Sequence, residues 1–314
     1  MKNLWSDHQA RSFVRRYAKA GVNKDRALLV YMSRLLGGES RLVLHGGGNT
    51  SVKTVMPDIL GRKTEVLCVK GSGRDLGDME PQGLPAVRLG PLREMAGLKK
   101  LSDQDMVNAQ RINLLDSTSP NPSVETLLHA FLPHKFIAHT HANAVLSLTN
   151  RKGGEAMCHR VFGKRMGLVP YIMPGFDLSK KAFEVFEADP AVEGLILLKH
   201  GIFTFGDTAG EAYKRMIDMV TLAEKRLKKG RKKAFAAARL SKKTASLADI
   251  APILRGLTRH DAKRLIFDFR GGKKVLDFVN GRDLKRYACQ GTATPDHVIR
   301  TKPKPLITPV PESG

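Results

Sequence analysis

The stretch Phe136-Ile137-Ala138-His139-Thr140-His141 is the most informative part of this chain. Alternate residues of an extended strand project to the same side, so a strand here would point His139 and His141 in one direction. A third histidine, His200, ends an apolar run just before Gly201, where a sheet edge can present a neutral imidazole. Three histidines that leave one coordination position open are typical of a catalytic metal site.

The neighbouring sequence decides between this metal site and the alternative that the histidines are ordinary core residues. Ten histidines in 314 residues also produce close pairs by chance, and a histidine beside an apolar strand is more often a core residue than a ligand. Three short elements before the histidine pair favour the metal site. They are Gly46-Gly47-Gly48-Asn49-Thr50-Ser51, Lys70-Gly71-Ser72-Gly73 and Ser123-Val124-Glu125-Thr126-Leu127-Leu128-His129.

With these elements the chain resembles the class II aldolase/adducin family. Its members share a Gly-Asn-x-Ser turn, a Ser-Gly turn, a Ser-x-Glu, a His-x-His and a distant Lys-His-Gly-like element, in this order. Residues 246–306 also resemble the end of the aldolase half of bifunctional rhamnulose-1-phosphate aldolase/alcohol dehydrogenases. No Gly-x-Gly-x-x-Gly follows a strand here, so we expect the hydride-transfer half to be missing.

The resemblance implies a fold and an assembly. The fold is the three-layer α/β/α fold of class II sugar-phosphate aldolases, whose subunits commonly form tetramers with active sites between neighbours. Strands that alternate with helices along the chain agree with this class. We expect residues 1–245 to form the catalytic domain, and residues 246–314 to form a small C-terminal α+β appendage with a Pro-rich tail.

Local patterns predict the individual elements. Ser6, Asn23 and Thr208 are suited to begin helices, and a helix over 124–132 would place Glu125 in its first turn. In the appendage we expect a hairpin whose arms, 265–269 and 275–279, flank Gly271-Gly272. The other strands are expected at 41–45, 51–55, 64–69, 135–140, 195–198 and 202–205, and the other helices at 103–115, 142–148, 179–187, 247–254 and 284–289.

The resemblance also implies roles for single residues. His139, His141 and His200 would hold a divalent metal, most often zinc with three imidazoles. Glu125 would be the acid/base that moves a proton at the enediolate carbon. His129 would share its helix face and orient the carboxylate, unless the two form a plain surface pair. The phosphate cradle would consist of Gly48, Asn49, Ser72, Gly73 and Ser123. No motif identifies the second base.

The implied reaction is the reversible cleavage of a ketose 1-phosphate, similar to rhamnulose 1-phosphate, into dihydroxyacetone phosphate and an aldehyde. A sugar-phosphate epimerase, dehydratase or decarboxylase on the same metal site is the first alternative. The second is a non-catalytic, adducin-like binding protein. Adducin-type domains have lost the ligand histidines, so the presence of all three argues against this second alternative.

A net charge of +23 raises the question of a polyanionic partner. Much of this charge lies between Lys225 and Lys243, a stretch without any acidic residue. It is either a solvated helix end, whose cations complement the helix dipole, or a binding surface for nucleic acid. We favour the helix end, because no helix-turn-helix, zinc finger or aromatic RNA-binding signature accompanies it. The positive field would also attract a sugar-phosphate substrate.

Composition favours a cytoplasmic protein. No apolar run of about 18 residues is present, so we expect no membrane span. The first residues lack the charged start and apolar stretch of a secretory signal. Cys68, Cys158 and Cys289 are scattered and odd in number, which fits a reducing compartment better than a disulfide framework.

The polar tail segment 294–302 is too specific in its resemblance to be a plain linker. In one interpretation Arg300 and His297, whose side chains are suited to bind a phosphate or a hydroxyl group of the substrate, face the site. The alternative is an ordered tail that packs on its own domain, with Asp296 as a turn residue. The sequence leaves both interpretations open.

Overall fold

The computed structural model describes residues 1–230, 235–239, 244–259, 261, 263 and 265–311. The chain divides into two compact units. Unit 1 comprises Met1–Gly230 and Ala293–Thr301, and unit 2 comprises Arg231–Thr292 and Lys302–Gly314. Residues 293–301 therefore belong to unit 1, although they lie within the range expected for the appendage.

Unit 1 is built on a mixed sheet of seven strands in the order β3-β2-β1-β4-β7-β6-β5. All neighbours pair antiparallel except β5 and β6, which are parallel. Apolar side chains fill the central strands, because both faces of the sheet are covered by helices. The strands are β1 Asn49–Pro57, β2 Lys63–Val69, β3 Ala86–Arg88, β4 Phe136–Thr140, β5 Met166–Val169, β6 Gly194–Leu197 and β7 Gly201–Gly206.

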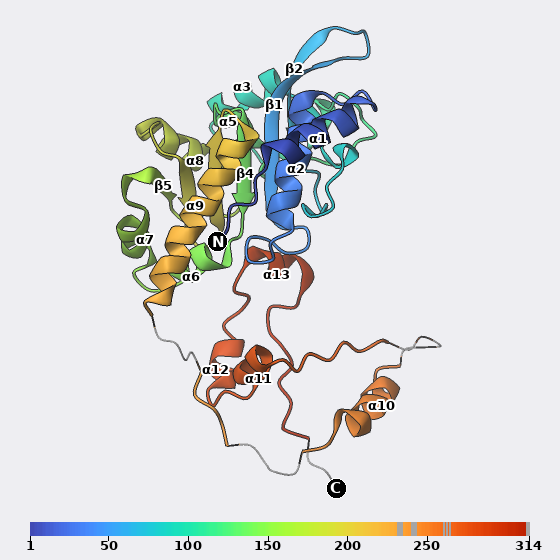
Figure 1. Ribbon diagram of the computed structural model, residues 1–314, viewed down its shortest axis with the longest axis vertical. Helices are drawn as coiled ribbons and strands as arrows, with labels where there is room; N and C mark the ends of the chain where they lie inside the picture. Colours follow the sequence, from blue (N-terminus) through green and yellow to red (C-terminus); the bar gives the residue numbers. More distant parts are fainter. Residues whose placement is uncertain (231–234, 240–243, 260, 262, 264, 312–314) are drawn as a thin grey trace. The chain divides into compact units, whose positions relative to one another are not determined.

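Helices cover the sheet on both faces, which gives the α/β/α layering that the sequence predicted (Figure 1). One apolar core lies between the sheet and the first helical layer, and two smaller cores lie under the second layer. The first layer contains α1 Asp7–Ala18, α2 Lys24–Gly37, α6 Asn143–Thr149, α7 Gly154–Phe162 and α9 Ala209–Lys228. The second contains α3 Leu89–Glu94, α4 Asp103–Ile112, α5 Thr126–Phe131 and α8 Phe176–Ala188.

Three helix starts follow the sequence signals. The side chains of Ser6, Asn23 and Thr208 each accept a hydrogen bond from a backbone N–H group in the first turn of α1, α2 and α9. A helix leaves its first N–H groups without partners, so each cap satisfies a donor that would otherwise be unpaired. These predictions are confirmed because capping is a local property of the chain.

Two local predictions next to the site are wrong. Residues 41–45 form a turn instead of a strand, because the backbone N–H groups of Leu42 and Val43 both donate to the carbonyl of Glu39. Helix α5 begins at Thr126, so Glu125 precedes the helix instead of lying in its first turn. A turn closed by the hydrogen bond from Thr126 to the Ser123 carbonyl delays this helix start.

Among its described residues, unit 2 contains helices α10 Leu247–Leu257, α11 Lys273–Val279 and α12 Leu284–Ala288. The expected hairpin is wrong: its second arm lies in α11, and residues 265–272 have no regular secondary structure. Val275, Phe278 and Val279 recur three and four positions apart, a spacing that suits one face of a helix better than a strand.

The basic stretch begins as a helix end. Helix α9 runs to Lys228 and carries Lys225 and Arg226 in its last turn, where cations complement the helix dipole. Residues 231–234 and 240–243 of the stretch lie outside the described residues. Nowhere in the part of the chain that the structure describes does a helix combine the length and apolar character needed to cross a membrane.

The contact between α2 and the sheet is a test of the core. Leu29 is completely buried there, so we expect Leu29→Ala to lower the free energy of unfolding by about 2–5 kcal/mol through lost burial and a cavity. Ile112→Ala, at a side chain that is 70% exposed, should change it by less than about 0.5 kcal/mol. Urea denaturation of both variants measures the difference, and equal effects would contradict this packing.

Candidate metal centre

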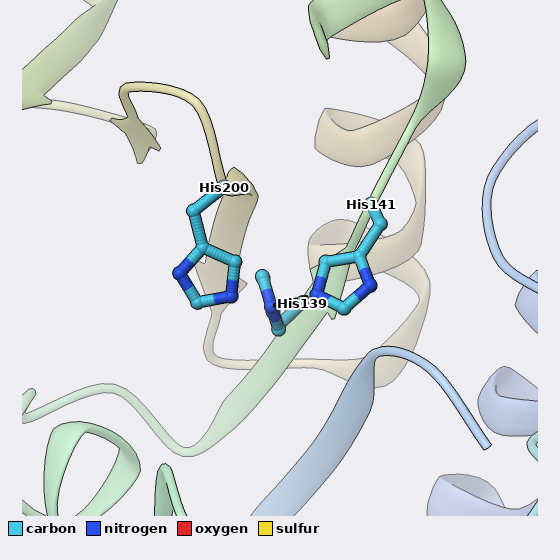
Figure 2. A group of neighbouring side chains, drawn as sticks. All are labelled: His139, His141 and His200. Atoms are coloured by element: carbon cyan, nitrogen blue, oxygen red, sulfur yellow. Dashed lines mark hydrogen bonds between the residues drawn. The ribbon is translucent and has the colours of Figure 1, made fainter. Parts of the chain in front are cut away.

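The three histidines meet at one end of the central strands of the sheet (Figure 2). His139 lies on β4, His141 follows the end of this strand, and His200 lies in the turn between β6 and β7. Because β4 and β7 pair antiparallel, the end of one strand lies beside the start of the other. All three side chains are buried, and their ligand atoms lie within 4.8 Å of one another.

The turn that presents His200 is tight. The backbone N–H of His200 donates to the carbonyl of Leu197 at 3.0 Å, and Lys199 adopts a left-handed conformation with φ of 62°. A Cβ atom on Gly201 would lie 2.4 Å from the Thr140 carbonyl and 2.9 Å from the His139 ring. The glycine therefore lets this turn approach β4 closely enough to join the histidines.

Hydrogen bonds assign the protons of two rings. His139 Nδ1 lies 3.1 Å from the carbonyl of Ile202, and His141 Nδ1 lies 2.6 Å from Asp296 Oδ1. Both partners only accept, so each ring carries its proton on Nδ1 and presents a lone pair on Nε2. These two Nε2 atoms face each other at 3.1 Å. Zn–N bonds of about 2.0–2.1 Å in tetrahedral geometry place ligand nitrogens about 3.3 Å apart, so the pair fits a metal ion.

Burial favours the metal-binding form of two of the imidazoles, those of His139 and His200. It lowers the pKa of His139 well below the ordinary value, and the neighbouring His141 and His200 lower it further. Burial also lowers the pKa of His200, while Glu125 partly opposes this shift. A neutral imidazole is the ligand form, so both shifts favour metal binding by these two rings.

The carboxylate of Glu125 faces two of the histidines. Its Oε2 lies 3.3 Å from His139 Nε2, and its Oε1 lies 3.3 Å from His200 Nε2. Among the described residues, Glu125 Oε1 is a buried atom without a hydrogen-bond partner. An unpaired buried carboxylate oxygen is costly, and a cation among the three histidines would compensate it.

A buried chain of hydrogen bonds holds Glu125 in place. Asn49 pairs with His139 across β1 and β4, and its Nδ2 donates to Glu125 Oε2 at 2.7 Å. Its Oδ1 lies 2.5 Å from His129 Nε2, and His129 Nδ1 lies 2.7 Å from the Ser51 hydroxyl. His129 therefore acts on Glu125 through Asn49, and the alternative of a surface pair is wrong because both residues are buried.

Asp296 is the site residue that sequence reasoning missed. It belongs to helix α13, Pro295–Arg300, and its carboxylate lies against His141, 155 positions away in the sequence. His297 Nδ1 lies 2.6 Å from the Thr294 hydroxyl, and Arg300 Nε donates to the His45 carbonyl at 3.4 Å. A short acidic residue at a helix start has a complete local explanation, so no local signal distinguishes Asp296.

The five expected phosphate-binding residues come from three segments that pack together. A bridge between Gly71 and Pro122 joins the second and third segments, and Lys70 joins the second to Thr50. The side chain of Asn49 is already used by Glu125, Ser123 and His129. The Ser123 hydroxyl oxygen accepts from Asn49 Nδ2 at 2.9 Å and from the Glu125 N–H at 3.4 Å, so its O–H proton is the part left to donate to a ligand. Gly48 and Gly73 adopt left-handed conformations that favour glycine.

Lys70 links two of these turns. Its Nζ donates to the carbonyl of Gly46 at 2.9 Å and to that of Arg74 at 2.7 Å. Burial lowers the pKa of Lys70 to about 8, although Asp75 and other acidic neighbours oppose the shift. The lysine thus ties the glycine turn to the Ser-Gly turn.

The family model for the class II aldolase and adducin N-terminal domain matches residues 27–227, and that for the second domain of class II aldolases matches residues 245–314. The chain therefore belongs to the class II aldolase and adducin family. The class II aldolases of this family use a divalent metal, and the buried three-histidine group of this chain has the donors to bind one.

Two proteins of known sequence or structure are similar to most of this chain. The uncharacterized oxidoreductase YuxG of Bacillus subtilis (strain 168) is 34% identical over 313 residues, which cover 98% of this chain and 44% of that protein. The chain thus spans less than half of that relative. The N-terminal class II aldolase domain of a conserved protein from Thermoplasma acidophilum is 40% identical, with a TM-score of 0.65, and the match covers 72% of this chain and 99% of that one.

The buried His129 predicts a pH dependence of stability. Burial lowers its pKa from 6.5 to about 3, with Lys53 adding repulsion. Below pH 6.5 the unfolded chain binds a proton at His129 that the folded chain excludes. The stability that neutral His129 contributes at higher pH is therefore lost as the pH falls toward 3. At pH 5 the loss is about 2 kcal/mol. Urea denaturation of metal-free protein at pH 7.5 and 5 measures it.

The matched variants isolate this histidine. His129→Gln should reduce the difference in stability between the two pH values by about 2 kcal/mol. His8→Gln, at an exposed histidine, should leave the difference unchanged. The same pH dependence in His129→Gln and in the wild type would contradict a buried neutral His129.

Proposed function

We propose that the chain is a metal-dependent class II aldolase that cleaves a ketose 1-phosphate, similar to rhamnulose 1-phosphate, into dihydroxyacetone phosphate and an aldehyde. The observation that carries the proposal is the buried group of His139, His141 and His200 with Glu125 directly beside it. Membership of the class II aldolase and adducin family supports it. The two class II aldolase domains that match consecutive parts of the chain support it as well.

The metal would be zinc, since three imidazoles suit this ion. When bound, a divalent ion supplies Lewis-acid stabilisation of the negative charge that develops on substrate oxygens. The chain holds the imidazoles of His139 and His141 with their lone pairs toward one point. The donor set thus explains why no lysine Schiff base is needed.

Glu125 is proposed to carry the proton of the reaction. Cleavage of the C3–C4 bond removes the proton of the C4 hydroxyl and leaves the electron pair at C3, where a proton must be added to give dihydroxyacetone phosphate. The carboxylate is buried beside the metal ligands and fixed through Asn49, so it suits delivery of that proton to C3.

The phosphate group of the substrate is proposed to bind at Gly48, Asn49, Ser72, Gly73 and Ser123. The hydroxyls of Ser72 and Ser123 are the donors that remain available for it. Lys70, which joins the neighbouring turns, would add a positive charge close by.

The same site also suits an epimerase, dehydratase or decarboxylase, because each needs a proton-carrying carboxylate next to a Lewis acid. A non-catalytic, adducin-like role fits less well with an intact group of three buried histidines. A homotetramer, a cytoplasmic location and a lack of nucleic-acid binding by the basic stretch remain predictions.

Metal analysis tests the centre directly. We expect about one transition-metal ion per chain, because imidazole donors favour zinc and its neighbours over magnesium or calcium. His200→Ala should lose most of this metal and the activity together, whereas His159→Ala, at an exposed histidine, should keep both. Undiminished metal content in folded His200→Ala would contradict the proposed ligand set.

Glu125→Gln tests the proton transfer. The amide keeps the shape but cannot carry a proton, so turnover should fall by about 100-fold or more while metal content and fold remain. The assay measures release of dihydroxyacetone phosphate from rhamnulose, fuculose and ribulose phosphates by the metal-loaded chain.

The outcomes separate the alternatives. Glu155→Gln, at an exposed carboxylate, should leave turnover unchanged. Loss of metal together with activity in Glu125→Gln would make Glu125 a ligand or a support of the ligands. Conversion of a sugar phosphate without release of dihydroxyacetone phosphate would favour the epimerase, dehydratase or decarboxylase.

A further inference from the structure

We infer that Asp296 is a positioning residue that completes the metal centre from the distant segment Ala293–Thr301. In this role it fixes the ring of His141 and directs its Nε2 toward the metal. The inference rests on the proposed function, because it assigns Asp296 a role toward the proposed metal ion.

The carboxylate of Asp296 is fully engaged. Oδ1 accepts from His141 Nδ1 at 2.6 Å, and Oδ2 accepts from the backbone N–H group of Leu44 at 2.8 Å. Asp296 is only 3% exposed, so water does not compete for these bonds. A carboxylate on the far nitrogen of a metal-binding histidine fixes its tautomer and raises its basicity. The two bonds therefore orient both the carboxylate and the ring.

The glycine turn is shaped to receive this carboxylate. A Cβ atom on Gly47 would lie 1.6 Å from Asp296 Oδ1, so any larger residue there would displace the carboxylate. Two further contacts hold the segment: Asn150 Nδ2 donates to the Ala293 carbonyl at 2.9 Å, and Arg300 contacts the His45 carbonyl. The lack of a side chain at Gly47 therefore leaves the space that the Asp296 carboxylate occupies.

Metal binding and docking of the segment are coupled through Asp296. If the docked carboxylate strengthens the bond of His141 to the metal, the bound metal must stabilise the docked segment by the same free energy. The segment is joined at both ends to unit 2 by the chain itself. Metal should therefore slow hydrogen exchange at the amides of His297 and Thr301, which bond within the segment.

The test compares Asp296→Asn with Val298→Ala in the full chain. The asparagine should weaken zinc affinity by about 10–100-fold, measured by competition with a chromophoric chelator. Val298→Ala, on the same helix but 68% exposed, should leave the affinity unchanged. The visible absorption spectrum of the cobalt-loaded chain should also change in Asp296→Asn, because the field of the His141 ligand changes. Unaltered affinity and spectrum would overturn the inference.

A second pair of variants covers a failure of Asp296→Asn to fold. Gly47→Ala should displace the carboxylate and weaken zinc affinity similarly, whereas Gly90→Ala, where a Cβ atom meets nothing, should not. If Gly47→Ala also fails to fold, hydrogen exchange of the wild type decides: exchange at His297 and Thr301 that zinc does not slow overturns the inference.

The outcome for the wild type separates the two proposals. A wild-type chain that binds no zinc or cobalt overturns the metal-dependent function and this role with it. A wild-type chain that binds metal tightly, with Asp296→Asn equal to it, overturns the role of Asp296 alone.

Discussion

The two Nε2 lone pairs of His139 and His141, buried and 3.1 Å apart, are the constraint around which the site is arranged. Neither ring can turn its proton inward, because the Ile202 carbonyl and Asp296 hold both protons on the opposite nitrogens. Lone pairs that face each other repel unless a cation lies between them. Strand β4, the turn before β7 and the segment with Asp296 together enforce an arrangement that a metal ion stabilises.

The balance of buried charges also favours a cation among the three histidines. Glu125 and Asp296 bring two buried carboxylic groups to three buried imidazoles, and burial lowers the pKa of two of these, His139 and His200. Buried carboxylates are costly unless opposite charge compensates them. Lys70 lies near this group, and with a pKa of about 8 it supplies one positive charge at neutral pH against two carboxylates, while its Nζ is directed to backbone carbonyls. A divalent cation would balance both carboxylates at the position where the histidines converge.

Local signals predicted much of the fold and part of the site. The helix caps and the strand that carries His139 depend on neighbours in the sequence, and the structure confirms them. Asp296 could not be predicted in this way, because its contact with His141 spans 155 positions and its local context already suggests a turn residue. The same holds for Gly47, whose necessity comes from an oxygen atom that only the folded chain brings near.

The sequence does not identify the substrate, because the expected substrate-binding residues are divided between the buried sheet and exposed turns. His139 and Asn49 lie on paired strands, and Glu125 is fixed to Asn49, so the chemical groups are held by the sheet. Ser72 and Gly73, by contrast, lie in an exposed turn. Turns vary more freely than a buried sheet without loss of the core. The strands therefore hold the three histidines and Glu125 in place, while the turns can be remodelled for a different substrate.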